Sequence, residues 1–289
     1  MKEAFIKLHL SIIIAGATGI FGKLITLNEG LLVWYRMLLA SMLLLLWLAA
    51  RREVPKIPLK AMLQIGGVGL LLGIHWVLFY GSIKASNVSI GVVCFSSIGF
   101  FTALFEPLIY RRRVSFRELF FSLLTLAGIL LIFHFDSRYR LGIAMGICSA
   151  ALAALFTIAN KRVGQHYPGR TMLLYEMGGG FLGISCLLPF YFHFFSVEVV
   201  FPGMWDLLYL FLLASVCTIG LYLLQIAALR SISAFTLNLS YNLEPIYSII
   251  LAMILFNENK ELNTAFYAGL GIIVLSVVLQ TWSVLKKRS

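Results

Sequence analysis

Long apolar runs separated by short connections constrain this chain more than any other feature. A membrane-spanning helix needs about 20 consecutive, mostly apolar residues, and the 289 residues contain ten such runs. They cover residues 5–26, 30–50, 61–83, 87–110, 116–134, 140–162, 170–193, 204–227, 231–256 and 263–285. The strands of a membrane β-barrel would instead show segments of about ten residues with alternating polarity. We therefore expect an all-helical integral membrane protein with ten transmembrane helices.

Composition excludes a soluble enzyme. Hydrophobic residues make up 61% of the chain and charged residues 12%, whereas soluble domains contain roughly 45–50% and about 25%. A soluble protein of this size has too little interior to bury so much apolar surface. The first run follows Lys2 and includes Lys7, and it has no small-residue cleavage site. We therefore expect it to be a retained helix and not a cleaved signal peptide.

The basic residues are distributed unequally between the two sides of the predicted bundle. The formal net charge is +11, but in such an apolar chain this excess indicates basic membrane loops and no nucleic-acid partner. Seventeen Lys and Arg residues fall at the N-terminus, in loops 51–60, 111–117 and 161–170, at Arg230 and in the C-terminal tail. Five fall on the other side. Because cytoplasmic loops carry the excess of Lys and Arg, we expect a multi-pass protein of the cytoplasmic membrane with both termini in the cytoplasm.

Short matches recur at about half the chain length and indicate an internal repeat. The matched segments are Tyr35-Arg36-Met37 with Tyr175-Glu176-Met177, Gly22-Lys23 with Asn160-Lys161, and Lys84 with Arg230. Each copy would contain five helices, and an odd number inverts the second copy in the membrane. We expect two inverted five-helix repeats, residues 1–136 and 137–289, with a solute site between them near the midplane.

The second half also carries a family pattern. Glu244-Pro245, Phe256-Asn257-Glu258 and Ala268-Gly269 resemble the second repeat of EamA-type members of the drug/metabolite transporter superfamily. The chain departs from that pattern at Asn257, where Gly is usual, at Ser96-Ser97, where a Pro-containing pair is common, and at Arg111–Arg113, where an acidic residue often lies. The resemblance implies a ten-helix fold and transport activity. The superfamily moves amino acids, amines, nucleotide sugars and other solutes, so no single substrate is implied.

Glu244 is the most informative single residue. It lies about 13 residues, or roughly 20 Å, into its run, close to the membrane midplane. A charge there costs at least ~2.5–3.5 kcal/mol, so it should face a cavity, a partner or a proton. Pro245 removes one backbone donor and frees the carbonyl of Tyr241. The alternative is a hydrogen bond between helices that only fixes their packing.

Other polar and aromatic residues at mid-depth are candidates for the same solute cavity. They are His75, Trp76, Tyr80, Ser96, Ser97, Tyr222, Gln225, Asn238, Tyr241 and Asn242. Such side chains suit an amphipathic or aromatic solute through stacking and hydrogen bonding. The alternative for His75 and Trp76 is a His bonded to a neighbouring carbonyl and a Trp that faces lipid.

Three further charges are predicted to lie away from the midplane. Arg36 and Glu176 should be about 9 Å from opposite membrane faces, which favours two separate vestibule charges over one salt bridge. Arg36 snorkelling outward is the alternative. Glu106 lies near the cytoplasmic end of its run beside Arg111–Arg113, where a structural or gating ion pair is favoured over a solute contact.

Several common signatures are missing from the sequence. It contains no phosphate-binding loop, no His-Glu-x-x-His zinc spacing and no nucleophile motif, and its four cysteines form no Cys-x-x-Cys pair. Glycines spaced four apart, such as Gly69 with Gly73 and Gly179 with Gly183, favour close helix packing. We expect no cofactor, no metal and no nucleotide-driven pump.

These observations favour a secondary transporter that exports small neutral or zwitterionic metabolites, such as amino acids, by alternating access. Its partners would be the solute, the lipid bilayer and a coupling proton. A polyanion such as a nucleotide sugar would require several Lys or Arg at mid-depth. The alternatives are a membrane enzyme acting on lipid-linked substrates, which would need acidic or His clusters at a membrane face, and a passive channel.

Overall fold

The structure is a computed structural model that describes residues 2–134, 139–195, 197, 199–241, 243–260 and 262–286. Every secondary-structure element in these ranges is a helix. The helices are α1 (Lys2–Leu24), α2 (Glu29–Ala50), α3 (Leu59–Ala85), α4 (Val88–Phe95), α5 (Ile98–Tyr110), α6 (Phe116–His134), α7 (Arg140–Gly164), α8 (Gly169–Phe194), α9 (Met204–Ala214), η2 (Ser215–Gly220), α10 (Leu221–Leu229), α11 (Ala234–Tyr241), α12 (Glu244–Phe256), η3 (Glu258–Lys260) and α13 (Thr264–Lys286).

Each expected apolar run contains one of these helices or several in succession. Within the described residues, seven stretches are long and apolar enough to cross a membrane: α1, α2, α3, α4 with α5, α7, α8, and α9 through α10. Shorter apolar helices lie at residues 119–131, 244–256 and 264–276. The all-helical membrane class is therefore confirmed, whereas the count of ten membrane helices and the inverted repeats stay predictions.

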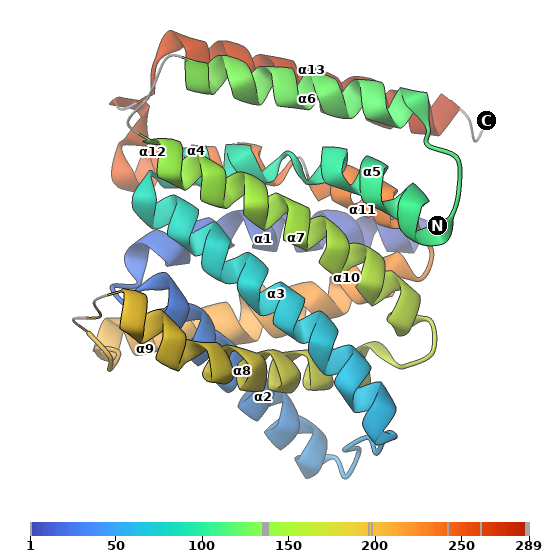
Figure 1. The fold of residues 1–289 in the computed structure, drawn as a ribbon, viewed down its shortest axis with the longest axis vertical. Helices are drawn as coiled ribbons and strands as arrows, with labels where there is room; N and C mark the ends of the chain where they lie inside the picture. The colour runs from blue at the N-terminus through green and yellow to red at the C-terminus, as the bar shows by residue number, and fades with distance from the viewer. Residues whose placement is uncertain are drawn as a thin grey trace.

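The helices form a bundle around α3 and α1. Helix α3 packs along α7 and α8, and α1 packs against α10 and α12. Helices α6 and α13 lie side by side at one edge of the bundle (Figure 1). Of the four cysteines, Cys94 and Cys217 are buried, whereas Cys148 and Cys186 are exposed on their helix surfaces. In a membrane an exposed thiol of this kind can face lipid, so the apolar runs around these cysteines did not require burial.

The basic loops gather at one end of the bundle. The loops at residues 51–58, 111–115 and 165–168 lie on the right in Figure 1, the side on which the N-terminus and the end of α13 also lie. We call this side the basic end and the other side the opposite end.

Two of the expected runs are broken near their centres. The first break falls at Ser96 and Ser97, where Ser97 Oγ donates to the Cys94 carbonyl at 2.7 Å and competes with the helical pattern. The second falls between α11 and α12, and Pro245 in the first turn of α12 has no N–H to continue the helix. Helix α4 packs against α12 and α5 packs against α11. The four half-helix ends therefore meet in the middle of the bundle.

Glycines set the distance between α3 and α8, as the four-residue spacing predicted. A Cβ placed on Gly69 would overlap the main chain of Glu176, whereas a Cβ on Gly67 would meet no atom within 4 Å.

We therefore expect Gly69→Ala to destabilise the protein by about 1–3 kcal/mol, because the two helices must separate to admit the methyl group. Gly67→Ala, two residues away on the open side of α3, should stabilise it by about 0.5–1 kcal/mol, because alanine restricts the unfolded chain. Thermal unfolding of the purified variants in one detergent measures both effects. Equal shifts in Tm for the two variants would contradict the packing role of Gly69.

Candidate functional site

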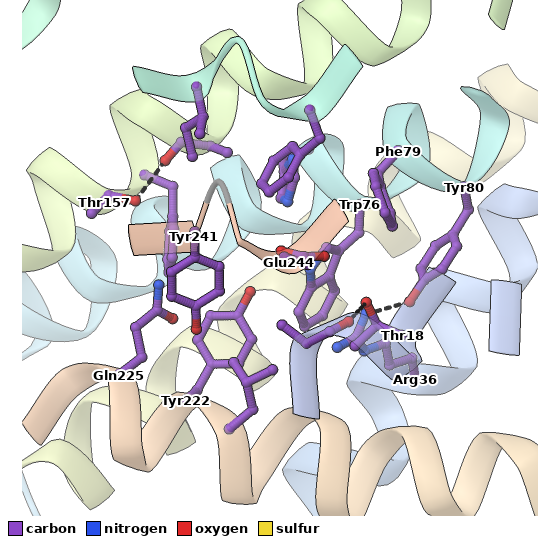
Figure 2. Close-up of a pocket in the computed structure, with 17 residues that line it drawn as sticks. Thr18, Arg36, Trp76, Phe79, Tyr80, Thr157, Tyr222, Gln225, Tyr241 and Glu244 are labelled. Carbon is purple, nitrogen blue, oxygen red and sulfur yellow. Dashed lines mark hydrogen bonds between the residues drawn. The ribbon is translucent and has the colours of Figure 1, made fainter. Parts of the chain in front are cut away.

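A small cavity lies where the broken helices meet the centre of the bundle. Its walls come from α1, α2, α3, α4, α5, α7, α10, α11 and α12, and its volume is about 50 Å³ (Figure 2). A single water needs at least about 10–15 Å³ measured in this way, so the cavity holds a few waters and no metabolite. A metabolite would therefore have to widen this space in order to enter it.

Seven of the predicted residues line this cavity. They are His75, Trp76, Tyr80, Tyr222, Gln225, Tyr241 and Glu244. Figure 2 shows those it labels directed toward one space from helices that lie far apart in the sequence. Four helices, α3, α10, α11 and α12, bring these side chains together.

The other four predicted cavity residues are placed differently. Ser96 and Ser97 are buried at the break between α4 and α5, and neither lines the cavity. The side chain of Asn238 and the whole of Asn242 lie outside the described part of the chain.

Arg36 was expected near the outer face and instead lines the cavity with an exposed fraction of 1%. Its Nε donates to Thr218 Oγ1 at 2.8 Å, its Nη1 to the Tyr80 hydroxyl at 2.6 Å and its Nη2 to the Cys217 carbonyl at 3.0 Å. The guanidinium carbon also lies 3.5 Å from the centre of the Trp76 ring.

The physical reason for this inward placement is a set of buried acceptors. Residues 215–220 form a π-helical turn, η2, and π turns interrupt the regular α-helical pattern of carbonyl bonding. Arg36 bonds the Cys217 carbonyl and the Thr218 hydroxyl of this turn. With three acceptors and an aromatic face in place of water, the guanidinium has no need to snorkel.

Glu244 is the first residue of α12, and 3% of its surface is exposed. The start of a helix carries unpaired N–H groups and a partial positive charge, which favours a carboxylate there. Glu244 and Arg36 line the same cavity, as Figure 2 shows. One acidic and one basic side chain thus face a single buried space.

Aromatic rings form most of the remaining wall. Trp76 and Tyr222 meet edge to face with ring centres 5.7 Å apart, and His75 stacks on Phe95 at 5.3 Å. His75 also bonds the Ser149 hydroxyl and carbonyl at 2.8 and 3.0 Å through Nδ1. His75 therefore combines both readings of the sequence, since it lines the cavity and is held by a neighbouring carbonyl.

Nine lining residues were missed by the sequence analysis. Five are threonines or phenylalanines (Thr18, Phe79, Phe95, Phe156 and Thr157), and four are small or aliphatic (Ala15, Ile98, Ala153 and Leu221). Phenylalanine and threonine are common throughout these apolar runs, so no local signal distinguishes them.

Glu176 was expected in a vestibule and is instead fully buried on α8. Neither of its carboxyl oxygens has a hydrogen-bond partner among the described residues. The main chain of Glu176 also lies directly against Gly69 of α3, so this part of α8 packs inside the bundle.

Glu106 lies near the basic end of the bundle, in the last turns of α5, and caps a helix. Its Oε2 accepts a hydrogen bond from the Phe235 N–H at 3.1 Å, at the start of α11. Beside it, Lys161 Nζ donates to the carbonyls of Leu229 and Ile232 at 3.1 and 2.6 Å. Within the described ranges, the expected partners Arg111–Arg113 form no salt bridge with Glu106, and its carboxylate binds a backbone N–H.

At the opposite end of the bundle, Glu258, which the sequence analysis named only as part of the family pattern, forms a network of contacts. Glu258 accepts from Lys23 Nζ at 2.9 Å, from the N–H groups of Val88 and Ser89 at 3.1 and 3.0 Å, and from Ser89 Oγ at 2.6 Å. Lys84 Nζ adds a bond to the Ile25 carbonyl at 3.0 Å. These contacts join the end of α1 to the start of α4.

This network predicts a pH-dependent stability. Burial raises the pKa of Glu258. The hydrogen bonds from Ser89, Lys23 and the two backbone N–H groups together lower the pKa by more than burial raises it, so the net pKa lies below its usual value. A lowered pKa stabilises the fold above the unfolded-state pKa of about 4.3, and this stabilisation is lost as the pH falls through the folded-state value. We expect Glu258→Gln to lower stability by about 1–3 kcal/mol near pH 7. The Tm difference from wild type should shrink below about pH 4, and a constant difference down to pH 3 would contradict the assignment.

The sequence model of the EamA-like transporter family matches residues 4–134 and again residues 140–282. The chain belongs to the EamA-like transporter family. This confirms the resemblance drawn from residues 244–269. The EamA chain is thus a multi-pass membrane transporter.

Two relatives carry compatible descriptions. The chain is 27% identical over 283 residues to "Uncharacterized transporter YxxF" of Bacillus subtilis, covering 95% of this chain and 87% of the relative. It is 26% identical to an "Uncharacterized transporter" of Archaeoglobus fulgidus, with 97% of each chain covered. A solved crystal structure matches all of both chains with a TM-score of 0.69 at 17% identity, which supports the fold of this EamA protein.

Proposed function

We propose that this protein is a secondary transporter that exports a small zwitterionic metabolite, such as an amino acid, by alternating access. The observation that carries the proposal is the presence of Arg36 and Glu244 in one buried, aromatic-walled cavity. Opposite charges facing one space match a solute that carries an ammonium and a carboxylate.

Each part of such a solute has a partner. A guanidinium has five N–H donors in a planar fork, and Arg36 makes three hydrogen bonds in this structure, so donors are left for a carboxylate. Glu244 offers an anion for the ammonium group. The rings of Trp76, Phe79 and Tyr222 offer apolar surface for the side chain of the solute.

The same inventory disfavours a polyanion. Among the described residues that line the cavity, Arg36 is the single Lys or Arg. A nucleotide sugar carries several negative charges and would require more cationic donors. A neutral or zwitterionic solute requires no cationic side chain beyond Arg36.

Alternating access between two inverted halves, residues 1–136 and 137–289, is part of the proposal. The breaks at Ser97 and Leu243 are 146 residues apart, and so are the left-handed residues Arg111 and Asn257 that end α5 and α12. The family model also matches each half separately. In this cycle, opening at the opposite end would require release of the Glu258 contacts, and opening at the basic end would require release of the Glu106 and Lys161 contacts. Glu244 would carry a coupling proton.

The inverted arrangement predicts a testable topology with both termini in the cytoplasm. A reporter that works only in the cytoplasm should be active when fused after Ser289 or inserted in loop 51–60. It should be inactive in loop 194–203, which contains no Lys or Arg. Cytoplasmic activity in loop 194–203 would exclude the inverted topology.

The transport proposal is tested with purified protein in liposomes. A panel of neutral amino acids, the corresponding amines without a carboxylate, and a nucleotide sugar is assayed for counterflow. We expect amino acids to move and the other two classes to move far more slowly. Movement of the nucleotide sugar without any amino acid would overturn the proposal, and chemical conversion without movement would favour the membrane enzyme.

A further inference from the structure

A second hollow lies on the surface of the bundle between α2, α3 and α8. It is an apolar groove of about 780 Å³, and none of the residues that line it also lines the central cavity. Its wall includes the exposed side chains of Met42, Leu45, Leu63 and Leu182. Surfaces of this kind on membrane helices face the acyl chains of the bilayer.

Two pairs of glycines give the groove its shape. Gly66 and Gly179 pack directly on each other, so α3 and α8 come close together there. Gly67 and Gly178 also line the groove, yet a Cβ on either one would meet no atom within 4 Å. Close packing of the two helices therefore explains why residues 66 and 179 are glycines. Gly67 and Gly178 leave the groove open beside that contact.

The end of the groove is basic. Val54 in the connection between α2 and α3 and Leu59 at the start of α3 line it at the basic end. That connection carries Arg51, Arg52, Lys56 and Lys60, all exposed, against the single acidic residue Glu53. Glu53 is paired with Arg170 at the start of α8. The rim of the groove therefore presents an excess of positive charge where the helices leave the membrane.

We propose that this groove is a binding site for an anionic diacyl phospholipid, with one acyl chain along Gly67 and Gly178 and the phosphate at the basic rim. An apolar groove continuous with a cationic rim matches the two parts of such a lipid. A juxtamembrane Lys or Arg strengthens the attraction of an anionic headgroup by about fivefold per residue. A zwitterionic lipid has the same chain but gains little from the rim.

The charge also argues against the other occupants. A second copy of the chain docked symmetrically would bring two basic rims of the same sign together. The transported solute would occupy the central cavity, whose lining is separate from that of the groove. The inference depends on the chain lying in a membrane and does not depend on the proposed solute.

Native mass spectrometry tests the lipid site. The intact protein in detergent is mixed with equal amounts of dioleoyl phosphatidylglycerol and dioleoyl phosphatidylcholine, and retained lipid is counted. Gly67→Leu and Gly178→Leu would fill the groove, and a Cβ at either position meets no atom within 4 Å. Gly271→Leu on α13 is the matched control, because its Cβ also meets no atom within 4 Å. Thermal unfolding confirms that all variants fold.

We expect wild type and the Gly271→Leu variant to retain phosphatidylglycerol preferentially, and the groove-filling variants to lose that retention. The double variant Arg51→Gln with Lys60→Gln should reduce the preference by roughly 25-fold, at about fivefold for each charge. Equal retention of the two lipids by wild type would overturn the proposal. So would unchanged retention after the groove is filled, loss of a dimer in the filled variants, or displacement of the lipid by a transported amino acid.

Discussion

Replacing Arg36 with glutamine should lower transport of a zwitterionic solute by about 100-fold or more. Truncating one partner of a buried, hydrogen-bonded charge pair costs about 2–5 kcal/mol, and each 1.4 kcal/mol is tenfold. Arg36→Lys keeps the charge but loses the planar fork that faces a carboxylate, so it should restore only part of the activity. Counterflow in liposomes at matched protein amounts measures the effect.

The amine analogue of the solute separates binding from packing. It has no carboxylate, so its slow movement should be unchanged in Arg36→Gln if Arg36 binds that group. Arg36 also joins α2 to Tyr80 on α3 and to Thr218 in η2, which is a structural role. If packing were its whole role, transport of the amine and the amino acid would fall together and in parallel with Tm.

Glu244→Gln should also reduce transport by about 100-fold, and it should remove the pH dependence of what remains. Glutamine keeps the shape and most hydrogen bonding of the side chain but cannot pair with an ammonium group or carry a proton. Truncating one member of a buried charge pair, here Glu244 with the ammonium group of the solute, costs about 2–5 kcal/mol, and this cost sets the expected size of the effect. The measurement is transport against pH in liposomes, with wild type beside the variant.

Ser248→Ala is the control for packing by the same helix. Ser248 lies one turn further along α12, and its Oγ donates to the Gly16 carbonyl at 2.7 Å. Its loss should lower stability and leave the pH profile intact. If Glu244→Gln transports like wild type at every pH, Glu244 is a packing residue beside a proline, and the proposed coupling proton is wrong.

Membership of the family and the all-helical membrane class could be predicted because both depend on local pattern. Glu244-Pro245 marks a proline in the first turn of α12, and the helix begins there in the structure. Seven candidate cavity residues also meet in the structure, from His75 on α3 to Glu244 on α12. Polar and aromatic side chains are uncommon at mid-depth in apolar runs, and such residues usually face the bundle interior.

The direction of Arg36 could not be predicted in the same way. Its depth in the helix suggested an outward path to water, since nothing in residues 30–50 shows the acceptors that hold it. Those acceptors come from Tyr80 and from Cys217 and Thr218, which lie 44 to 182 residues away along the chain. Glu176 was misplaced for a related reason, because helix α8 packs against α3, a contact that residues 170–193 alone do not reveal.

By itself, the sequence determined which segments become helices, because lipid offers the backbone no hydrogen-bond partner and an apolar run must satisfy its N–H and C=O groups internally. It also determined which end is basic. Only the tertiary structure decided what each helix face meets. Gly67 and Gly69 lie two residues apart in the same helix, yet one borders an open groove and the other touches a main chain. Successive helical residues point in different directions, and contacts between helices depend on distant residues that local pattern does not contain.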